Sequence, residues 1–192
     1  MVPRHSAIVR ITHWLHLAAF LALLVSGIAI LLAHPRLYWG ETGGEGSPAL
    51  LELPLPLNLD QSGWGRGLHF LAAWICVGNG LAYVFAGLWT RHFSAQMEKY
   101  EVAQRAAYRV VIFILTPLIV ISGLAMSPAV NSVIPIATVL GGHQSSRTIH
   151  FFVACILTLF LLLHILMVVA NGFRVRMRGM ITGEFAEEMK SQ

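Results

Sequence analysis

The sequence predicts an all-α integral membrane protein, a four-helix bundle that spans a lipid bilayer. Of its 192 residues, 56% are hydrophobic and only 11% are charged, whereas ordinary soluble domains have roughly 25% charged residues. Four apolar stretches are each long enough to cross a hydrocarbon core, which takes about 20 helical residues. Histidines occur within these stretches, where ionisable residues are rare and mark functional sites. The length suits a single domain over residues 1–192.

The four predicted transmembrane helices follow one another with few interruptions. The first covers about residues 11–33, contains no charged residue, and is too long for the apolar core of a typical signal peptide. The second covers about 68–89, the third about 106–126 and the fourth about 148–171. Pro117 lies inside the third helix, where it predicts a kink that neighbouring helices can accommodate.

The predicted connections differ in composition. Residues 34–65 form a loop rich in glycine and proline, with Trp39 and Trp64 expected near the membrane interface. Residues 90–105 are polar and charged, and residues 127–147 form a second irregular loop.

The distribution of basic residues predicts the orientation of the chain. The positive-inside rule places loops rich in lysine and arginine on the cytoplasmic side. With both termini in the cytoplasm, ten of the thirteen Lys and Arg residues lie on the cytoplasmic side of the membrane. The remaining three are Arg36, Arg66 and Arg147. The net charge of +4 thus arises beside apolar segments, which favours contact with membrane lipid and excludes nucleic acid as a partner.

The histidines occur at two depths in the predicted membrane. His150 and His164 of the fourth helix are 14 residues apart, so they share a face and lie about 21 Å apart along the axis. That spacing is too long for one metal ion and suits one haem near each membrane face. His69 matches the depth of His150, which defines an outer site, and His13 or His16 matches His164, which defines an inner site. Ligation by two histidines leaves iron no open position and favours electron transfer.

Arginines and cysteines refine this interpretation. Arg10, Arg66 and Arg147 each precede a histidine by three residues, a helical spacing that puts guanidinium and imidazole on neighbouring surface. Arginine pairs well with carboxylates, so these side chains are expected at the haem propionates. No CxxCH motif occurs, which argues against covalently attached c-type haem.

Other polar residues support weaker expectations. His16 and Asn79 are candidates for hydrogen bonding to an exchangeable quinone, although for Asn79 a bond between helices is the better expectation. The remaining histidines are expected in solvated tails or loops: His5, His34, His92 and His143.

Several motifs resemble a known family. RITHWLH in the first helix, RGLHFLAAW in the second, and RTIHF with LLLHILMVVANG in the fourth are similar to the bacterial cytochrome b561 family. That family is similar in turn to the di-haem b subunits of formate dehydrogenases, nickel–iron hydrogenases and thiosulfate reductases. MITG after the last helix also resembles those subunits. The resemblance excludes the 34–65 loop, and the chain lacks the fifth helix of the hydrogenase type.

The resemblance implies a ligand set. His13 and His164 would bind the inner haem, and His69 and His150 the outer haem, with none supplied by the third helix. The implied cofactors are two haem b groups with their iron, and the implied activity is electron transfer between the quinone pool and a redox partner. That partner would be a periplasmic oxidoreductase, such as a molybdopterin enzyme or a hydrogenase. A homodimer of this chain is a further expectation.

Two other functions stay open at this point. Stand-alone members of the family suggest a superoxide:quinone oxidoreductase. A transporter that relays protons or ions through histidines is an alternative from another class, and it predicts histidines strung along one path rather than paired at two depths.

Overall fold

A computed structural model describes residues 6–44, 46–54, 62–89 and 102–183 of the chain. Four of its helical segments are long and apolar enough to cross a membrane, as the sequence predicted. They are Ala7–Ala33, Gly63–Ala86, Ala106–Ala125 and His143–Ala170. The prediction of an all-α protein with four transmembrane helices is therefore confirmed. His5 and His92, and most of the 90–105 segment, lie outside the described residues.

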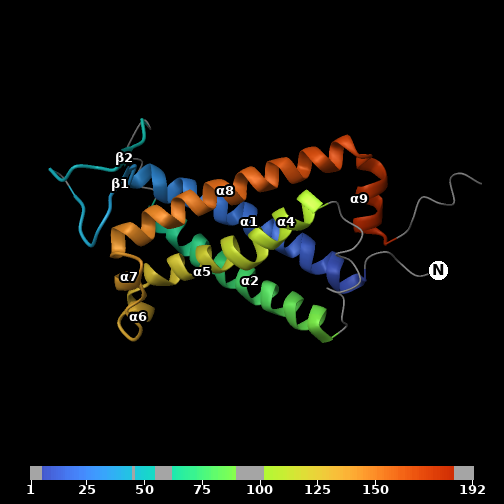
Figure 1. The fold of residues 1–192 in the computed structure, drawn as a ribbon, viewed down its shortest axis with the longest axis horizontal. Coiled ribbons are helices and arrows are strands. Elements are labelled where there is room, and N and C mark those ends of the chain that lie inside the picture. The colour runs from blue at the N-terminus through green and yellow to red at the C-terminus, as the bar shows by residue number, and fades with distance from the viewer. Residues whose placement is uncertain (1–5, 45, 55–61, 90–101, 184–192) are drawn as a thin grey trace, which may run out of the picture. The chain divides into compact units, whose positions relative to one another are not determined.

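The helices and strands follow the chain in the order shown in Figure 1. Helix α1 (Ala7–Ala33) leads into a short antiparallel hairpin of β1 (Arg36–Leu37) and β2 (Leu51–Glu52), and α2 is the second membrane helix (Ser62–Trp89). The remaining elements are α4 (Val102–Val110), η2 (Val111–Leu115), α5 (Thr116–Ala125), α6 (Pro128–Asn131), α7 (Ile136–Val139), α8 (His143–Ala170) and α9 (Phe173–Ile181).

These elements form two compact units. Unit 1 contains α1 up to Ile30, α2, and the chain from Leu162 onwards, which includes the second half of α8 and all of α9. Unit 2 contains the hairpin, the third membrane segment, and α8 up to Leu161. Each unit is described by itself below.

Two membrane helices begin earlier than the apolar pattern predicted. Helix α2 begins at Ser62 rather than near residue 68, and α8 begins at His143 rather than near residue 148. Polar and glycine residues open α2, and polar residues open α8, so hydropathy alone places both starts too late. The 127–147 segment is also less irregular than expected, because it contains α6, α7 and the first turn of α8.

The first turn of α8 is fixed to the loop after β1, within unit 2. The carbonyl of Gly40 accepts hydrogen bonds from the backbone N–H groups of Gln144 and Ser145, at 3.0 and 3.2 Å. These are amides that a helix cannot satisfy internally. Gly142 has a φ of 111°, and a Cβ there would collide with the backbone of Gly40. Glycine at this position therefore permits the close approach that caps α8.

The hairpin is held by short-range polar contacts. Arg36 pairs with Glu52 across the two strands, with a 2.9 Å ion pair from Nε to Oε1. This hydrogen bond and the charge of Glu52 raise the pKa of Arg36. Thr148 of α8 donates from its hydroxyl to the carbonyl of Tyr38 at 2.7 Å, in a fully buried position. The hairpin is thus anchored on the start of α8.

The third membrane segment contains a widened turn just before its proline. Residues of η2 follow a π-helical pattern, and the N–H of Thr116 donates to the carbonyl of Val111, five residues earlier. The Thr116 hydroxyl donates to the same carbonyl at 2.8 Å. Because Pro117 has no N–H and its ring crowds the preceding turn, the extra residue in this turn accommodates it. The expected disturbance at Pro117 therefore takes the form of a π-turn.

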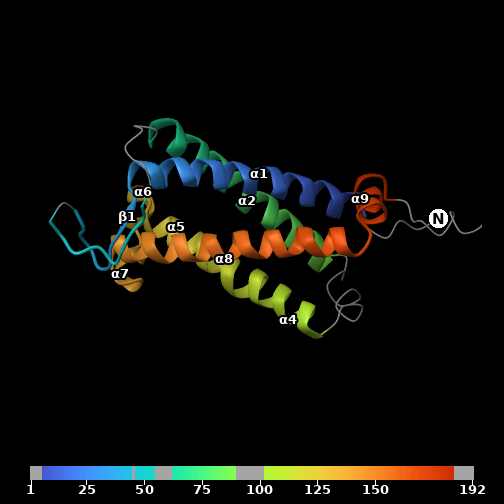
Figure 2. The same ribbon diagram turned by 90° about the horizontal axis from the view of Figure 1, so that it is seen from above.

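Helix α9 is attached to the start of α1, within unit 1. Arg10 donates from Nη1 to the carbonyl of Ile181 at 2.8 Å, and Trp14 donates from Nε1 to the carbonyl of Met180 at 3.1 Å. These are carbonyls of the last turn, which has no partners within its own helix. Figures 1 and 2 both show α9 beside the first turns of α1.

Small residues fill the interior of unit 1, and large apolar ones cover its surface. Ala19, Ala29 and Ala72 are buried, whereas Trp74 and Phe85 expose 65% and 68% of their area. Membrane helices pack through small residues and turn large apolar side chains toward lipid. The exposed side chains are therefore the expected lipid-facing surface.

Candidate functional site

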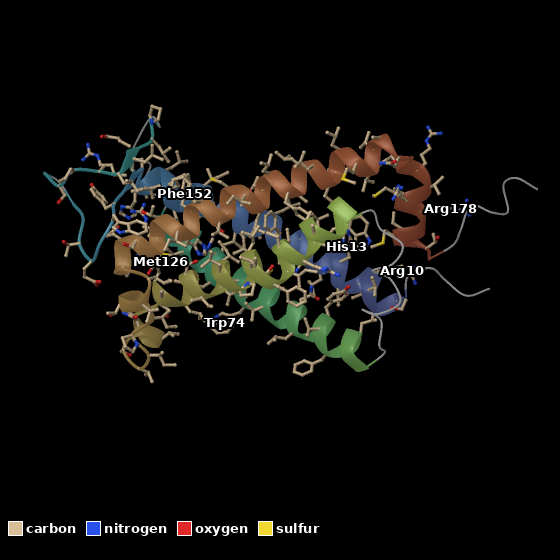
Figure 3. All side chains as sticks on the ribbon, viewed as in Figure 1. Arg10, His13, Trp74, Met126, Phe152 and Arg178 are labelled. Carbon is tan, nitrogen blue, oxygen red and sulfur yellow. The ribbon has the colours of Figure 1, made fainter. Side chains whose placement is uncertain are left out.

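His13 and His164, the family-implied pair of the inner site, lie together in unit 1. Their ring centroids are 6.4 Å apart, with ring planes tilted by 59°. An iron–nitrogen bond of about 2 Å and a further distance of about 1.1 Å to each ring centre would put two axial imidazoles about 6.2 Å apart. The observed separation therefore fits an iron bound between the two rings. Figure 3 shows His13 on α1, close along the helix to Arg10.

His16 has a different neighbour. Both of its ring nitrogens lie 3.6 Å from the Sγ of Cys76 on α2. The sequence left His13 and His16 as alternatives, and His13 is the one whose ring contacts that of His164.

The donor set suits haem rather than a bare metal ion. Among the described residues, no group of three or more His, Cys, Asp and Glu side chains could hold a metal ion. A haem supplies four ligands from its macrocycle and takes two axial ligands from protein. A histidine pair is therefore sufficient for haem, although it would be poor for zinc.

Arg10, three residues before His13 in the sequence, has one side-chain donor that is unused. Its Nη1 is bonded to α9, but its Nε is buried and has no hydrogen-bond partner among the described residues. A buried donor without a partner costs free energy. The carboxylate of a haem propionate would satisfy this nitrogen, which is what the spacing of Arg10 and His13 predicted.

His69 is held by α1 within unit 1. The Oγ of Ser26 lies 3.0 Å from Nδ1 of His69, and Ser26 is completely buried. Nδ1 is therefore the nitrogen that contacts α1, which leaves Nε2 as the nitrogen suited to a metal.

His150 has an equivalent partner within unit 2. The Oγ of Ser122 on α5 lies 3.1 Å from Nδ1 of His150, and Ser122 is also completely buried. Gly123 lies against the same ring, because a Cβ at this position would be 3.3 Å from Cε1 of His150. The histidine thus packs directly on the backbone of α5.

The other two predicted arginines differ in their surroundings. Arg66 is exposed near the start of α2. Arg147 donates from Nη1 to the carbonyl of Arg36 at 3.1 Å and from Nη2 to the carbonyl of His34. Arg147 therefore fastens β1 and the residues just before it, a role that the spacing to His150 did not predict.

Asn79 makes the bond between helices that the sequence favoured. Its Nδ2 donates to the carbonyl of Thr12 on α1 at 2.8 Å, and the side chain is only 8% exposed. This contact joins α2 to α1 one turn before His16.

Sequence reasoning missed Ser26 and Ser122. Both belong to the same four-residue pattern, Ser-Gly-Ile-Ala in α1 and Ser-Gly-Leu-Ala in α5. The repetition of this pattern in two apolar helices was the available signal. It has the small residues of a close helix contact, and it adds a hydroxyl.

Comparison with known proteins identifies the family. The model of the prokaryotic cytochrome b561 family matches residues 4–183. A curated relative from Azospira oryzae, named "Putative protein-methionine-sulfoxide reductase subunit YedZ1", is 29% identical over 194 residues. That match covers 85% of this chain and 89% of the relative. No solved structure matches this chain.

The family match extends over nearly the whole chain and includes His13, His69, His150 and His164. Together with the four membrane helices, it makes this chain a multi-pass membrane protein that carries haem b and transfers electrons. The chain belongs to the prokaryotic cytochrome b561 family.

Proposed function

We propose that this chain conducts electrons across the membrane through two haems, each bound by two histidines. His13 and His164 would hold the inner haem. His69 and His150 would hold the outer haem, a pairing that rests on their matched depth in the sequence and on the family resemblance. A bound haem supplies one-electron exchange between ferric and ferrous iron.

The observation that carries the proposal is the contact between His13 and His164. Two histidines 151 positions apart in the sequence place their ring centroids 6.4 Å apart. The two rings could lie together for packing alone. Their separation, however, also matches that expected for two histidines bound to one iron. The unsatisfied Nε of Arg10, three residues before His13, adds a donor for a propionate.

Each residue of the proposed sites has a defined task. The four histidines would hold the two haems, and iron bound by two histidines leaves no position for oxygen. Arg10 and Arg66 would supply positive charge for the propionates, which would favour the reduced state of each haem. The apolar helices exclude water, which limits reorganisation when an electron arrives.

The relative's name supports a partner and a direction of electron flow, and the basic residues support an orientation of the chain in the membrane. The Azospira oryzae relative is named as a subunit of a methionine sulfoxide reductase. We therefore propose that this chain passes electrons from the quinone pool to a partner reductase subunit outside the inner membrane. The basic residues before α1 and in α9 would keep both termini in the cytoplasm.

Family membership separates this proposal from the transporter alternative. A proton relay needs titratable groups along one continuous path, whereas a cytochrome needs them in pairs. No feature of the described residues favours the superoxide:quinone reaction over transfer to a partner protein.

A spectrum of the purified protein tests the proposal first. The dithionite-reduced minus oxidised spectrum should show a b-type α band, and a pyridine haemochrome assay should give two haems per chain. His164→Ala and His13→Ala should each lower the content to one haem. His16→Ala and His143→Ala are matched controls and should retain two.

The outcomes have distinct meanings. Two haems in His164→Ala would refute the inner ligand pair. Loss of one haem from His16→Ala, with two haems in His13→Ala, would assign the inner ligand to His16 instead. A folded wild-type protein with one haem would refute the electron path through two haems.

A further inference from the structure

We propose that Ser26 and Ser122 are positioning residues that hold the outer ligands His69 and His150 in the tautomer that binds iron. The inference rests on the proposed function, because it takes these two histidines as haem ligands. It adds two residues that are neither haem ligands nor charged, one of them on α5, which supplies no ligand.

The two serines occupy equivalent positions in their helices. Ser26 and Ser122 each have an exposed fraction of 0% and are each followed by glycine. Each lies within hydrogen-bonding distance of Nδ1 of one histidine, at 3.0 and 3.1 Å. The same arrangement thus occurs once in unit 1 and once in unit 2.

The position of the serine proton follows from the second contact of each hydroxyl. Ser26 Oγ lies 2.6 Å from the carbonyl oxygen of Ala22, and Ser122 Oγ lies 2.7 Å from that of Leu118. A carbonyl oxygen carries no proton, so at these distances the hydroxyl must donate. A hydroxyl has only one proton, and this bond uses it.

The histidine tautomer follows in turn. With its proton used, each serine oxygen can only accept from the imidazole, so Nδ1 must carry the hydrogen. In a neutral imidazole the lone pair is then on Nε2. Both histidines therefore present Nε2 as the nitrogen that can bind iron.

This bond also affects the iron electronically. A metal-bound histidine that donates its second N–H to an acceptor is oriented by it and becomes a more basic ligand. A more basic ligand stabilises ferric over ferrous iron, which lowers the reduction potential. We expect the serines to tune the outer haem in this way, opposing the effect of nearby arginines.

The glycines that follow the two serines differ in how closely they approach the histidine rings. A Cβ at Gly27 would meet His69 Cε1 at 3.7 Å, an ordinary contact, whereas one at Gly123 would lie 3.3 Å from His150 Cε1. His150 is thus confined between a hydroxyl and backbone. The serine bond therefore acts on a ring that has little freedom to turn.

The test compares the removal of each hydroxyl with its restoration. Ser26→Ala and Ser122→Ala lose the acceptor, whereas Ser26→Thr and Ser122→Thr keep a hydroxyl that can make the same bond to the helix. Thr158→Ala is the matched control, because Thr158 makes the same type of bond, to the carbonyl of Ala154 at 2.7 Å. All variants are purified as full chains with bound haem.

The readouts are haem content, potentiometric titration and the electron paramagnetic resonance spectrum of the ferric haems. In the alanine variants we expect the outer haem to dissociate about 10- to 100-fold more readily, the usual effect of losing such a partner. Where the outer haem is retained, its midpoint potential should rise. The inner haem should be unchanged, and the threonine variants should resemble wild type.

Several results would overturn the inference. One is an unchanged outer haem in both alanine variants, and another is a fall in its midpoint potential. A third is an equal loss of outer haem in the alanine and threonine variants, which would show that space rather than the hydroxyl matters. These results all require two haems in the wild type. A wild type without the outer haem would instead refute the proposed function.

Discussion

Replacement of Asn79 distinguishes a bond between helices from a quinone site. In the structure, its Nδ2 donates to the Thr12 carbonyl at 2.8 Å, in a position only 8% exposed. Asn79→Ala removes this bond between α2 and α1. We therefore expect a loss of stability, with little change in the apparent affinity for quinol.

The size of the loss follows from the geometry. Hydrogen bonds between membrane helices contribute about 0.6 kcal/mol on average and about 1.7 kcal/mol at most. The Thr12 carbonyl lies inside α1 and keeps its own helical partner in the variant, so no acceptor is left without a bond. The removed side chain is nonetheless buried. The free energy of unfolding should thus fall by about 1 kcal/mol, near the middle of that range.

Thermal unfolding in detergent, followed by loss of the haem Soret band, measures this change. A loss of about 1 kcal/mol corresponds to a fall in Tm of about 2–4 °C for a chain of this size. Asn171→Ala is the matched control, because Asn171 directly follows α8, is exposed, and donates from Nδ2 to the Met167 carbonyl at the end of that helix. Its effect should stay within about 0.5 kcal/mol. An unchanged Tm for Asn79→Ala, together with a many-fold higher KM for quinol, would refute the structural role.

Two further substitutions test the charges and contacts around the proposed sites. Arg66→Ala should lower the midpoint potential of the outer haem, because a cation that favours the reduced state is lost; an unchanged redox titration would contradict this. Trp14→Phe removes the donor to the Met180 carbonyl and should speed amide hydrogen exchange in the last turn of α9, with α2 unaffected. Equal exchange in variant and wild type would show that Arg10 alone holds α9.

The membrane helices were predictable because their signal is local. An apolar run of about 20 residues specifies a transmembrane helix without reference to the rest of the chain. Their first turns were not predictable, because α2 opens at Ser62 with polar and glycine residues and α8 opens at His143 with polar residues. For α8 the reason lies in tertiary structure, because the carbonyl of Gly40 caps its amides and is distant in sequence.

The histidines of the candidate site could be singled out from the sequence, whereas the residues that contact them could not. Histidines stand out in apolar helices because ionisable groups are rare there. Their depths left His13 and His16 open as partners of His164, and His13 is the one whose ring lies beside that of His164. Serines in apolar helices are a weaker signal, because most of them donate their hydroxyl proton to a backbone carbonyl of their own helix.

The spacing of each arginine from a histidine predicted where the arginine lies on its helix, but not which group it binds. Arg10 and Arg147 each precede a histidine by three residues, yet their guanidinium groups make different contacts. Arg10 bonds to α9 and keeps a buried Nε without a partner. Arg147 donates to the carbonyls of His34, just before the hairpin, and of Arg36 in β1. A spacing of three residues fixes position on one helix, whereas the partner depends on which chain segments pack against it.

The third membrane segment shows how a helix without ligands can still determine a haem site. Pro117 removes one backbone donor, and the π-turn before it shifts the phase of every later residue in the segment. Ser122 and Gly123 follow within two turns and contact His150 through a hydroxyl and a bare backbone. If the π-turn were replaced by regular helix, the added twist would rotate Ser122 away from the histidine. The proline and its π-turn therefore contribute to the placement of His150, together with the residues that contact it.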